Sequence, residues 1–122
     1  MDMPLPNPIV LSRKAELVAR LLTVLPRDAV IEDEMETRAY ECDALTAYKC
    51  PPLLAVLPRS TTEVSDILRI CHNMNVPVVP RGSGTSLAGG ALPTADCVIL
   101  GVARMNDVLE TDYANRVIRV QS

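Results

Sequence analysis

The sequence contains no Phe and no Trp, and its aromatic content is only 2%. Proteins that stack bases on aromatic rings need such side chains, so a single-stranded nucleic-acid binder is disfavoured. Twelve Lys and Arg residues against fifteen Asp and Glu residues give a net charge of −3. No broad attraction to nucleic acid or anionic lipid is therefore expected, and any bound phosphate must be held locally.

Long hydrophobic runs and metal-binding patterns are also missing. Apolar stretches without an interruption by proline or a polar residue are short, such as 97–103, and fall far below the roughly 18 to 20 residues that span a bilayer. Residues 1–4 show no basic region followed by an apolar block, so no secretory signal is expected. The four cysteines form no C-x-x-C pair, which predicts free thiols, a reducing compartment and no metal site.

The sequence does hold enough apolar material for one domain, with 48% hydrophobic residues in a chain of 122. Prolines 4, 6 and 8 predict an extended arm that cannot start a helix cleanly. The first helix is expected to run from an N-cap at Ser12 to the stop at Pro26. Its apolar face comprises Leu17, Val18, Leu21, Leu22 and Leu25.

Residues 28–49 are acidic and irregular, and predict a loop-rich connector with a short strand around Val30–Ile31. A buried strand is expected at 53–57, because this apolar run is bounded by prolines. Ser60 and Glu63 form a capping-box pattern that opens a helix ending near 73–75. The predicted buried face of that helix comprises Val64, Ile67, Leu68, Cys71 and Met74.

A second apolar strand at 77–80 completes a strand–helix–strand unit of the kind that joins parallel strands. A third strand is expected at 97–100, followed by a hairpin of 108–113 and 116–121 around Ala114–Asn115. The exposed hairpin edge predicts a truncated domain. The fold class is α+β, with an N-terminal arm, helix and connector at 1–46 and an incomplete domain at 47–122.

Four of the five glycines fall within 81–91, directly after the second strand of that unit. Without Cβ atoms, such residues let successive amides converge on an anion, and the Ser and Thr hydroxyls add donors. Diphosphate suits this loop, because open α/β sheets bind ligands at the ends of their strands. The alternative is that the glycines merely make a sharp turn and a close packing contact.

Two common phosphate-binding motifs are excluded by what the loop lacks. No lysine follows Gly84 or Gly89, so the P-loop pattern of nucleoside triphosphatases is absent. Leu87 stands where the dinucleotide fingerprint of NAD-binding proteins requires its third glycine. Nucleoside triphosphate hydrolysis and a standard NAD site are therefore both disfavoured.

The segment 77–93 resembles the pyrophosphate loop of the vanillyl-alcohol-oxidase type flavoproteins, which share a PCMH-type FAD-binding domain. Within them it is most similar to the family that contains the FAD-linked subunit of glycolate oxidase and the D-lactate dehydrogenases. The similarity includes Tyr40–Asp43, 52–58, 60–74 and 103–106, and covers roughly residues 28–122.

This resemblance implies a noncovalent FAD. Some members of the wider family attach the flavin through a histidine where Thr85 stands, and the only histidine here, His72, is expected on a helix surface. It implies no catalytic residue in this chain, because the substrate domain would follow it. The cofactor-binding residues that it implies are Pro80, Arg81, Gly82, Ser83, Gly84, Thr85, Ser86, Gly89 and Gly90.

The expected function is thus the FAD-binding portion of a 2-hydroxy-acid oxidoreductase of the glycolate or D-lactate type, inactive alone. The alternatives are a non-catalytic nucleotide-binding module or subunit, and a chain that binds no cofactor. The substrate would bind only in the complete enzyme, other oxidase subunits are potential partners, and no nucleic acid is expected. The expected location is cytoplasmic, or peripheral to a membrane through partner subunits.

Several polar residues remain open to two interpretations. Arg81 could contact a phosphate or brace the loop through an acidic neighbour, and the bracing role is favoured. Arg104 and Asn106 could touch the adenine side of the cofactor or cap the next turn. The resemblance places Tyr40 and Asp43 near the entrance of the cofactor domain, although acidic loop residues are mostly solvated.

Overall fold

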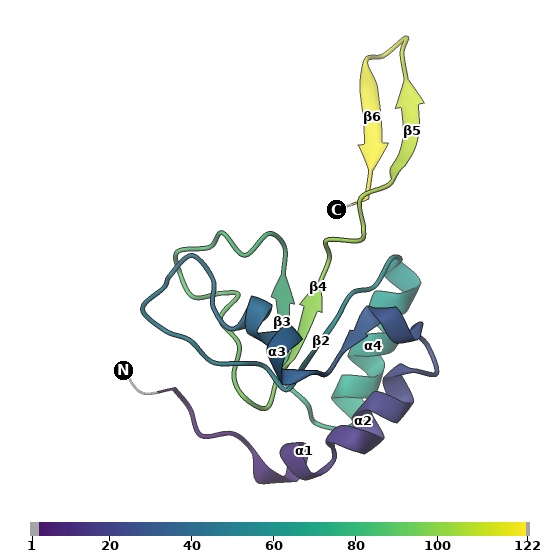
Figure 1. Ribbon diagram of the computed structural model, residues 1–122. Coiled ribbons are helices and arrows are strands. Elements are labelled where there is room, and N and C mark those ends of the chain that lie inside the picture. Colours follow the sequence, from purple (N-terminus) through teal and green to yellow (C-terminus); the bar gives the residue numbers. More distant parts are fainter. Residues whose placement is uncertain (1–2, 122) are drawn as a thin grey trace.

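The computed structural model describes residues 3–121, which form an α+β body and a separate hairpin (Figure 1). Expectations drawn from Met1, Asp2 and Ser122 lie outside the described residues. The elements are α1 (Pro8–Ser12), α2 (Lys14–Leu21), η1 (Arg27–Ala29), β1 (Val30–Ile31), α3 (Glu34–Thr37), η2 (Arg38–Tyr40), β2 (Leu54–Val56), α4 (Thr61–Asn73), β3 (Val78–Arg81), β4 (Val98–Gly101), β5 (Val108–Asp112) and β6 (Val117–Val120).

Helix formation begins earlier than the prolines predicted. Asn7 is the N-cap of α1, its side chain accepts a hydrogen bond from the Ile9 amide, and Pro8 occupies the first helical position. Proline is tolerated there because its missing N–H would have no partner in the first turn. The N-cap assigned to Ser12 was wrong, since its hydroxyl donates to the Ile9 carbonyl and α2 follows only after Arg13.

The connector holds more structure than predicted. The short strand at Val30–Ile31 is confirmed as β1. One turn of helix, α3, follows because the Asp33 carboxylate accepts hydrogen bonds from the amides of Met35 and Glu36. All four cysteines are free thiols, and two of them, Cys42 and Cys50, lie in this segment and are half-buried.

The central sheet has four strands in the order β1–β2–β4–β3. Strands β2 and β3 are each parallel to β4, and β1 pairs antiparallel with β2. The predicted strand–helix–strand unit is therefore present, but β4 inserts between its two strands. The carboxyl ends of β3 and β4 consequently lie side by side at one edge of the body.

The two central strands, β2 and β4, are buried on both faces, as their uninterrupted apolar runs predicted, whereas β3 at the edge is only half-buried. Helices α2 and α4 pack on one face against Leu54, Val56, Val98 and Leu100. The other face carries Ala55, Cys97 and Ile99. The neighbouring strand residues Ile31 and Val79 and the connector residue Tyr40 pack against them. Two expected core residues, Leu22 and Leu68, are instead exposed.

Helix α4 is defined at both ends by local hydrogen bonds. The Ser60 hydroxyl accepts from the Glu63 amide at 3.2 Å, which confirms the predicted cap. The Glu63 carboxylate accepts a 2.6 Å hydrogen bond from the Arg59 amide. In the usual capping box it would accept from the amide of the N-cap residue itself, here Ser60. At the other end, Asn75 adopts a φ of 54° and Val76 donates to the Cys71 carbonyl, which closes the helix.

The predicted hairpin is confirmed by β5 and β6, which pair antiparallel and stand away from the body in Figure 1. A hydrogen bond of 2.9 Å from the Gln121 side chain to the Arg59 carbonyl joins its base to the body. Its large apolar side chains are exposed, namely Val108, Leu109, Tyr113, Val117, Ile118 and Val120.

Candidate functional site: the glycine loop

The glycine loop, residues 82–91, leaves the carboxyl end of β3 and encloses an open hollow of about 330 Å³. Most of the predicted cofactor-binding residues line it, while Arg81 and Gly89 do not. Ala91 lines it as well, and sequence reasoning missed it because alanine carries no polar group to mark it. The lining residues are Pro80, Gly82, Ser83, Gly84, Thr85, Ser86, Gly90 and Ala91.

The amides of this loop are available for a ligand. Within residues 3–121, no amide of 82–87 donates a hydrogen bond to another group of the protein. The hydroxyls of Ser83 and Thr85 likewise have no protein partner in the described part of the chain, whereas the Ser86 hydroxyl accepts from the Ala88 amide at 3.2 Å. In other proteins, successive unpaired amides around a concavity bind anions, so the loop has the donors that such a site requires.

Two positions of the loop favour glycine because their backbone conformation disfavours a side chain. Gly84 and Gly89 have φ angles of 72° and 75°, a region that other residues rarely adopt. A Cβ atom at Gly84 would also lie 2.5 Å from Cζ of Arg81. Gly82, by contrast, has no atom within 4 Å of the Cβ position. Among the residues that line the hollow, Gly84 therefore cannot be replaced by a larger residue without strain, because both its φ angle and the neighbouring Arg81 side chain exclude a Cβ.

Arg81 braces the loop, but through different partners from those predicted. Its Nη1 donates a 2.7 Å hydrogen bond to the Cys42 carbonyl, and its Cζ lies 5.7 Å from the centre of the Tyr40 ring. No carboxylate of the described residues forms an ion pair with it, so the expected acidic neighbour is absent. The connector therefore supports the glycine loop from residues about 40 positions earlier in the sequence.

Asp43 was left open by the sequence, and the structure shows that it is buried, unlike most acidic residues of loops. One carboxylate oxygen accepts from the Leu45 amide at 2.9 Å, while the other, Oδ2, has no partner among the described residues.

Arg104 caps no turn; it donates hydrogen bonds to the Asp28 carboxylate and to the Asp28 carbonyl, each at 2.9 Å. Asn106 is exposed, and His72 lies on the surface of α4 as predicted.

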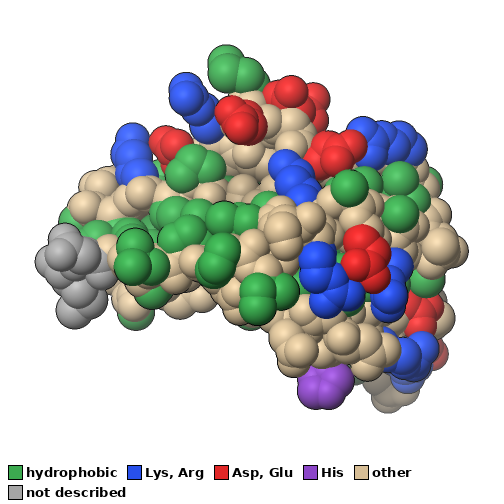
Figure 2. All heavy atoms as spheres, turned by 90° about the horizontal axis from the view of Figure 1, so that it is seen from below, with side chains coloured by type: hydrophobic (Ala, Val, Ile, Leu, Met, Phe, Trp, Pro, Cys, Tyr) green, Lys and Arg blue, Asp and Glu red, His purple; other side chains and the backbone are tan. Residues whose placement is uncertain are grey.

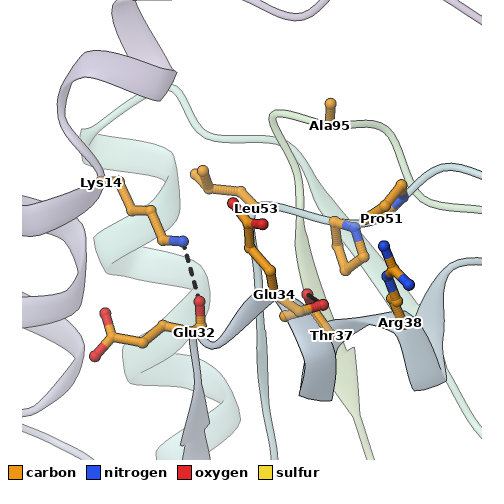
Figure 3. Close-up of a pocket in the computed structure, with 9 residues that line it drawn as sticks. Lys14, Glu32, Glu34, Thr37, Arg38, Pro51, Leu53 and Ala95 are labelled. Atoms are coloured by element: carbon orange, nitrogen blue, oxygen red, sulfur yellow. Dashed lines mark hydrogen bonds between the residues drawn. The ribbon is translucent and has the colours of Figure 1, made fainter.

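A second hollow lies at the opposite end of the sheet (Figure 3). It is bounded by the segments that precede β2 and β4, and Lys14 donates there to the Glu32 carbonyl at 3.1 Å. Its charged lining residues are two cations, Lys14 and Arg38, and two acids, Glu32 and Glu34. The two positive and two negative charges cancel, so this hollow is a less favourable site for a dianion than the glycine loop with its free amides.

A third hollow of about 320 Å³ adjoins the outer side of the glycine loop and is mostly apolar. Figure 2 shows that apolar side chains gather on the underside of the molecule. The N-terminal arm contributes to this hollow together with the connector and the far end of the loop. Its lining residues are Met3, Pro4, Leu45, Tyr48, Ala88, Gly89 and Leu92.

Comparison with known protein families matches residues 52–122 to the FAD binding domain family. The chain belongs to this family. Glycolate oxidase subunit GlcD of Escherichia coli K12 is 44% identical over 97 residues, which are 80% of this chain and 19% of that protein. The mitochondrial D-2-hydroxyglutarate dehydrogenase of Arabidopsis thaliana is 35% identical over 112 residues, or 92% of this chain and 20% of that protein.

Solved structures agree on the fold. An alkyldihydroxyacetonephosphate synthase superposes with a TM-score of 0.76 at 26% identity, over 98% of this chain and 25% of that one. A p-cresol methylhydroxylase gives 0.75 at 21% identity, over 88% of this chain and 22% of that one, and shows the fold alone. These results confirm the predicted family, the α+β FAD-binding fold and FAD as the cofactor. The chain spans about a fifth of the two curated relatives named above, at 19% and 20%.

In the described residues 3–121, no helix has both the length and the apolar character needed to cross a bilayer.

Proposed function

We propose that the hollow of the glycine loop holds the diphosphate of a noncovalently bound FAD, in the N-terminal part of an oxidoreductase that acts on 2-hydroxy acids. The observation that carries this proposal is the set of unpaired amides at 82–87 around the hollow. Amides fixed in this way stabilise an anion without the cost of reorganising on binding. The names of the relatives, a glycolate oxidase subunit and a D-2-hydroxyglutarate dehydrogenase, support the substrate class.

Backbone amides, side-chain hydroxyls and glycines of the loop have different roles in holding the cofactor. The amides of 82–87 donate to the phosphate oxygens, and the free hydroxyls of Ser83 and Thr85 add two further donors. Gly84 and Gly89 allow the backbone to turn beneath the anion. Bound FAD would accept the hydride of the substrate, and that chemistry belongs to the cofactor. Nothing in this chain is assigned to the reacting atoms.

Noncovalent attachment is supported by the residue types near the hollow. Thr85 lines it, and a threonine hydroxyl is not the imidazole through which a histidine tethers a flavin. The only histidine of the chain, His72, lies on α4, outside the loop. A domain boundary near residue 47, further oxidase subunits as partners, and a cytoplasmic or peripherally membrane-bound location are also proposed, and rest on the sequence and the resemblance.

The test compares three ligands on the purified 122-residue chain: FAD, ADP and riboflavin. FAD and ADP carry a diphosphate and riboflavin does not, so the first two should bind and compete with each other. Affinities in the millimolar range are expected, because contacts to the diphosphate supply only part of the binding energy. Riboflavin binding as tightly as FAD would contradict a site built on the diphosphate.

A matched pair of variants locates the site. Gly84→Asp adds a carboxylate to the hollow and a Cβ to a backbone with a φ of 72°, and should abolish binding of FAD and ADP. Ala15→Asp adds the same charge to the exposed first turn of α2 and should leave binding unchanged. Equal binding by Gly84→Asp and the parent chain would show that the ligand lies elsewhere.

A further inference from the structure

The geometry points to Arg81 as a positioning residue for the diphosphate, acting from behind the glycine loop rather than from within its hollow. This inference rests on the proposed function of the loop. Between residues 77 and 95, Arg81 is the only charged residue. A dianion bound by the amides of 82–87 would therefore find one cation in the whole segment, and the placement of that cation affects its binding.

Arg81 is held in place by three separate contacts. Its Nη1 donates to the Cys42 carbonyl at 2.7 Å, and its Cζ lies 5.7 Å from the centre of the Tyr40 ring. Its guanidinium also fills the space that a side chain at Gly84 would need, with Cζ and Nε at 2.5 and 3.0 Å from the Cβ position. The planar fork of arginine makes the first two contacts at once, which a lysine ammonium cannot do.

The positive charge of Arg81 stays uncompensated within the protein. The ion pairs formed by the described residues do not include Arg81. Glu41 and Asp43 flank Cys42 in the sequence, but neither forms an ion pair with Arg81: Glu41 pairs with Lys49, and one oxygen of Asp43 accepts from the Leu45 amide. The guanidinium is half-buried, so its field is screened less than that of a surface charge.

Gly84 connects this charge to the ligand site. It lines the hollow on one side and abuts the guanidinium on the other, whereas Arg81 itself does not line the hollow. Arg81 thus acts in two ways: it keeps the Gly84 turn in place, and it adds a positive field to that of the amides. Its neutral contacts, a carbonyl and an aromatic ring, fix the side chain without cancelling its charge.

The experiment measures FAD affinity at low and at physiological ionic strength for Arg81→Gln, Arg81→Lys and the control Arg69→Gln. Arg69 is exposed on α4, so its loss changes the net charge equally but far from the loop. Arg81→Gln should weaken FAD about tenfold, because the field of a half-buried positive charge near the phosphates is lost, and should flatten the salt dependence. Arg81→Lys keeps the charge and should keep the salt dependence, with a smaller loss of affinity.

Thermal midpoints of all three variants separate loss of fold from loss of charge. If Arg81 only tethered the loop, Arg81→Lys would bind as weakly as Arg81→Gln and both would retain the parent salt dependence, which would overturn the inference. A flattening by Arg69→Gln equal to that by Arg81→Gln would overturn it too. If the parent chain bound riboflavin as tightly as FAD, the proposed function itself would fail, and this result is distinct from an effect of Arg81.

Discussion

The backbone amide of Asn7 donates a 2.8 Å hydrogen bond to Oδ2 of Asp96, which joins residues 89 positions apart. The Asp96 carboxylate is largely buried and lies in the turn that precedes β4. This bond fixes the N-terminal arm to the body at the residue that caps α1. The arm is thereby held beside the apolar hollow that adjoins the glycine loop.

The Asp96 bond predicts a dependence of stability on pH. Burial alone would raise the pKa of Asp96, but hydrogen bonds from the Asn7 amide, the Thr94 hydroxyl and its own amide outweigh burial and lower the pKa. A carboxyl whose pKa is lower in the folded state stabilises the fold above its unfolded pKa, and this contribution is lost as the pH falls through the folded pKa.

Asp96→Asn should therefore lower the free energy of unfolding near neutral pH by about 1 kcal/mol, a typical value for such a bond. In acid, once the pH has fallen below the lowered pKa of Asp96 in the folded protein, both proteins carry a neutral side chain and the difference should shrink. Urea unfolding at the two pH values measures it. A difference that stays constant with pH would show that the charge of Asp96 contributes nothing.

Asn75 predicts the effect of a substitution at the end of α4. Its φ of 54° lies in the left-handed region, and its amide donates to the His72 carbonyl at 3.1 Å. Asn75→Ala should destabilise the protein by about 1 kcal/mol, because alanine lacks the polar side chain that lets asparagine adopt the left-handed region, whereas Asn75→Gly removes the Cβ and should be neutral or stabilising. Denaturant midpoints of the two variants test this. The account of the helix end is wrong if alanine is tolerated as well as glycine.

The cysteines should differ in their reactivity. Burial raises the pKa of Cys71 to about 11 and also raises that of Cys97, despite hydrogen bonds from Thr94 that lower it. Because the thiolate is the reactive form, both should resist a thiol reagent at about pH 8 in the folded protein. Cys42 and Cys50 are half-buried and should react, Cys50 more slowly because burial and the nearby Asp96 carboxylate also raise its pKa. Mass spectrometry identifies the modified cysteines, with and without urea. Modification of Cys71 in the absence of urea would contradict its burial in the folded protein.

Much of the body could be predicted because its signals are local. Prolines bound the β2 strand, and Ser60 marks the start of α4 within a single turn. The strand order could not be predicted in this way, because nothing local indicates that β4 inserts between β2 and β3. Leu68 follows the helical period of its neighbours, yet it is exposed because α2 and the sheet cover only a narrow stripe of α4.

The candidate site shows the same division. The glycine pattern predicted the loop, since φ freedom and small size are visible in the sequence itself, and the family resemblance implied most of the residues that line its hollow. The contacts that support the loop could not be predicted from the sequence. Arg81 contacts Tyr40 and Cys42, and these residues come together only in the folded protein. An aromatic ring and a backbone carbonyl took the place of the expected carboxylate, and no sequence pattern distinguishes these partners.

The amides at 82–87 are proposed to bind the diphosphate of FAD. The most direct test is an amide proton–nitrogen NMR spectrum of the isotope-labelled chain during titration with FAD. The account predicts that the signals of Ser83, Gly84, Thr85 and Ser86 shift first and most, with riboflavin leaving them in place. Shifts confined to residues at the opposite end of the sheet, such as Glu34 and Leu53, or no shifts at millimolar FAD, would contradict it.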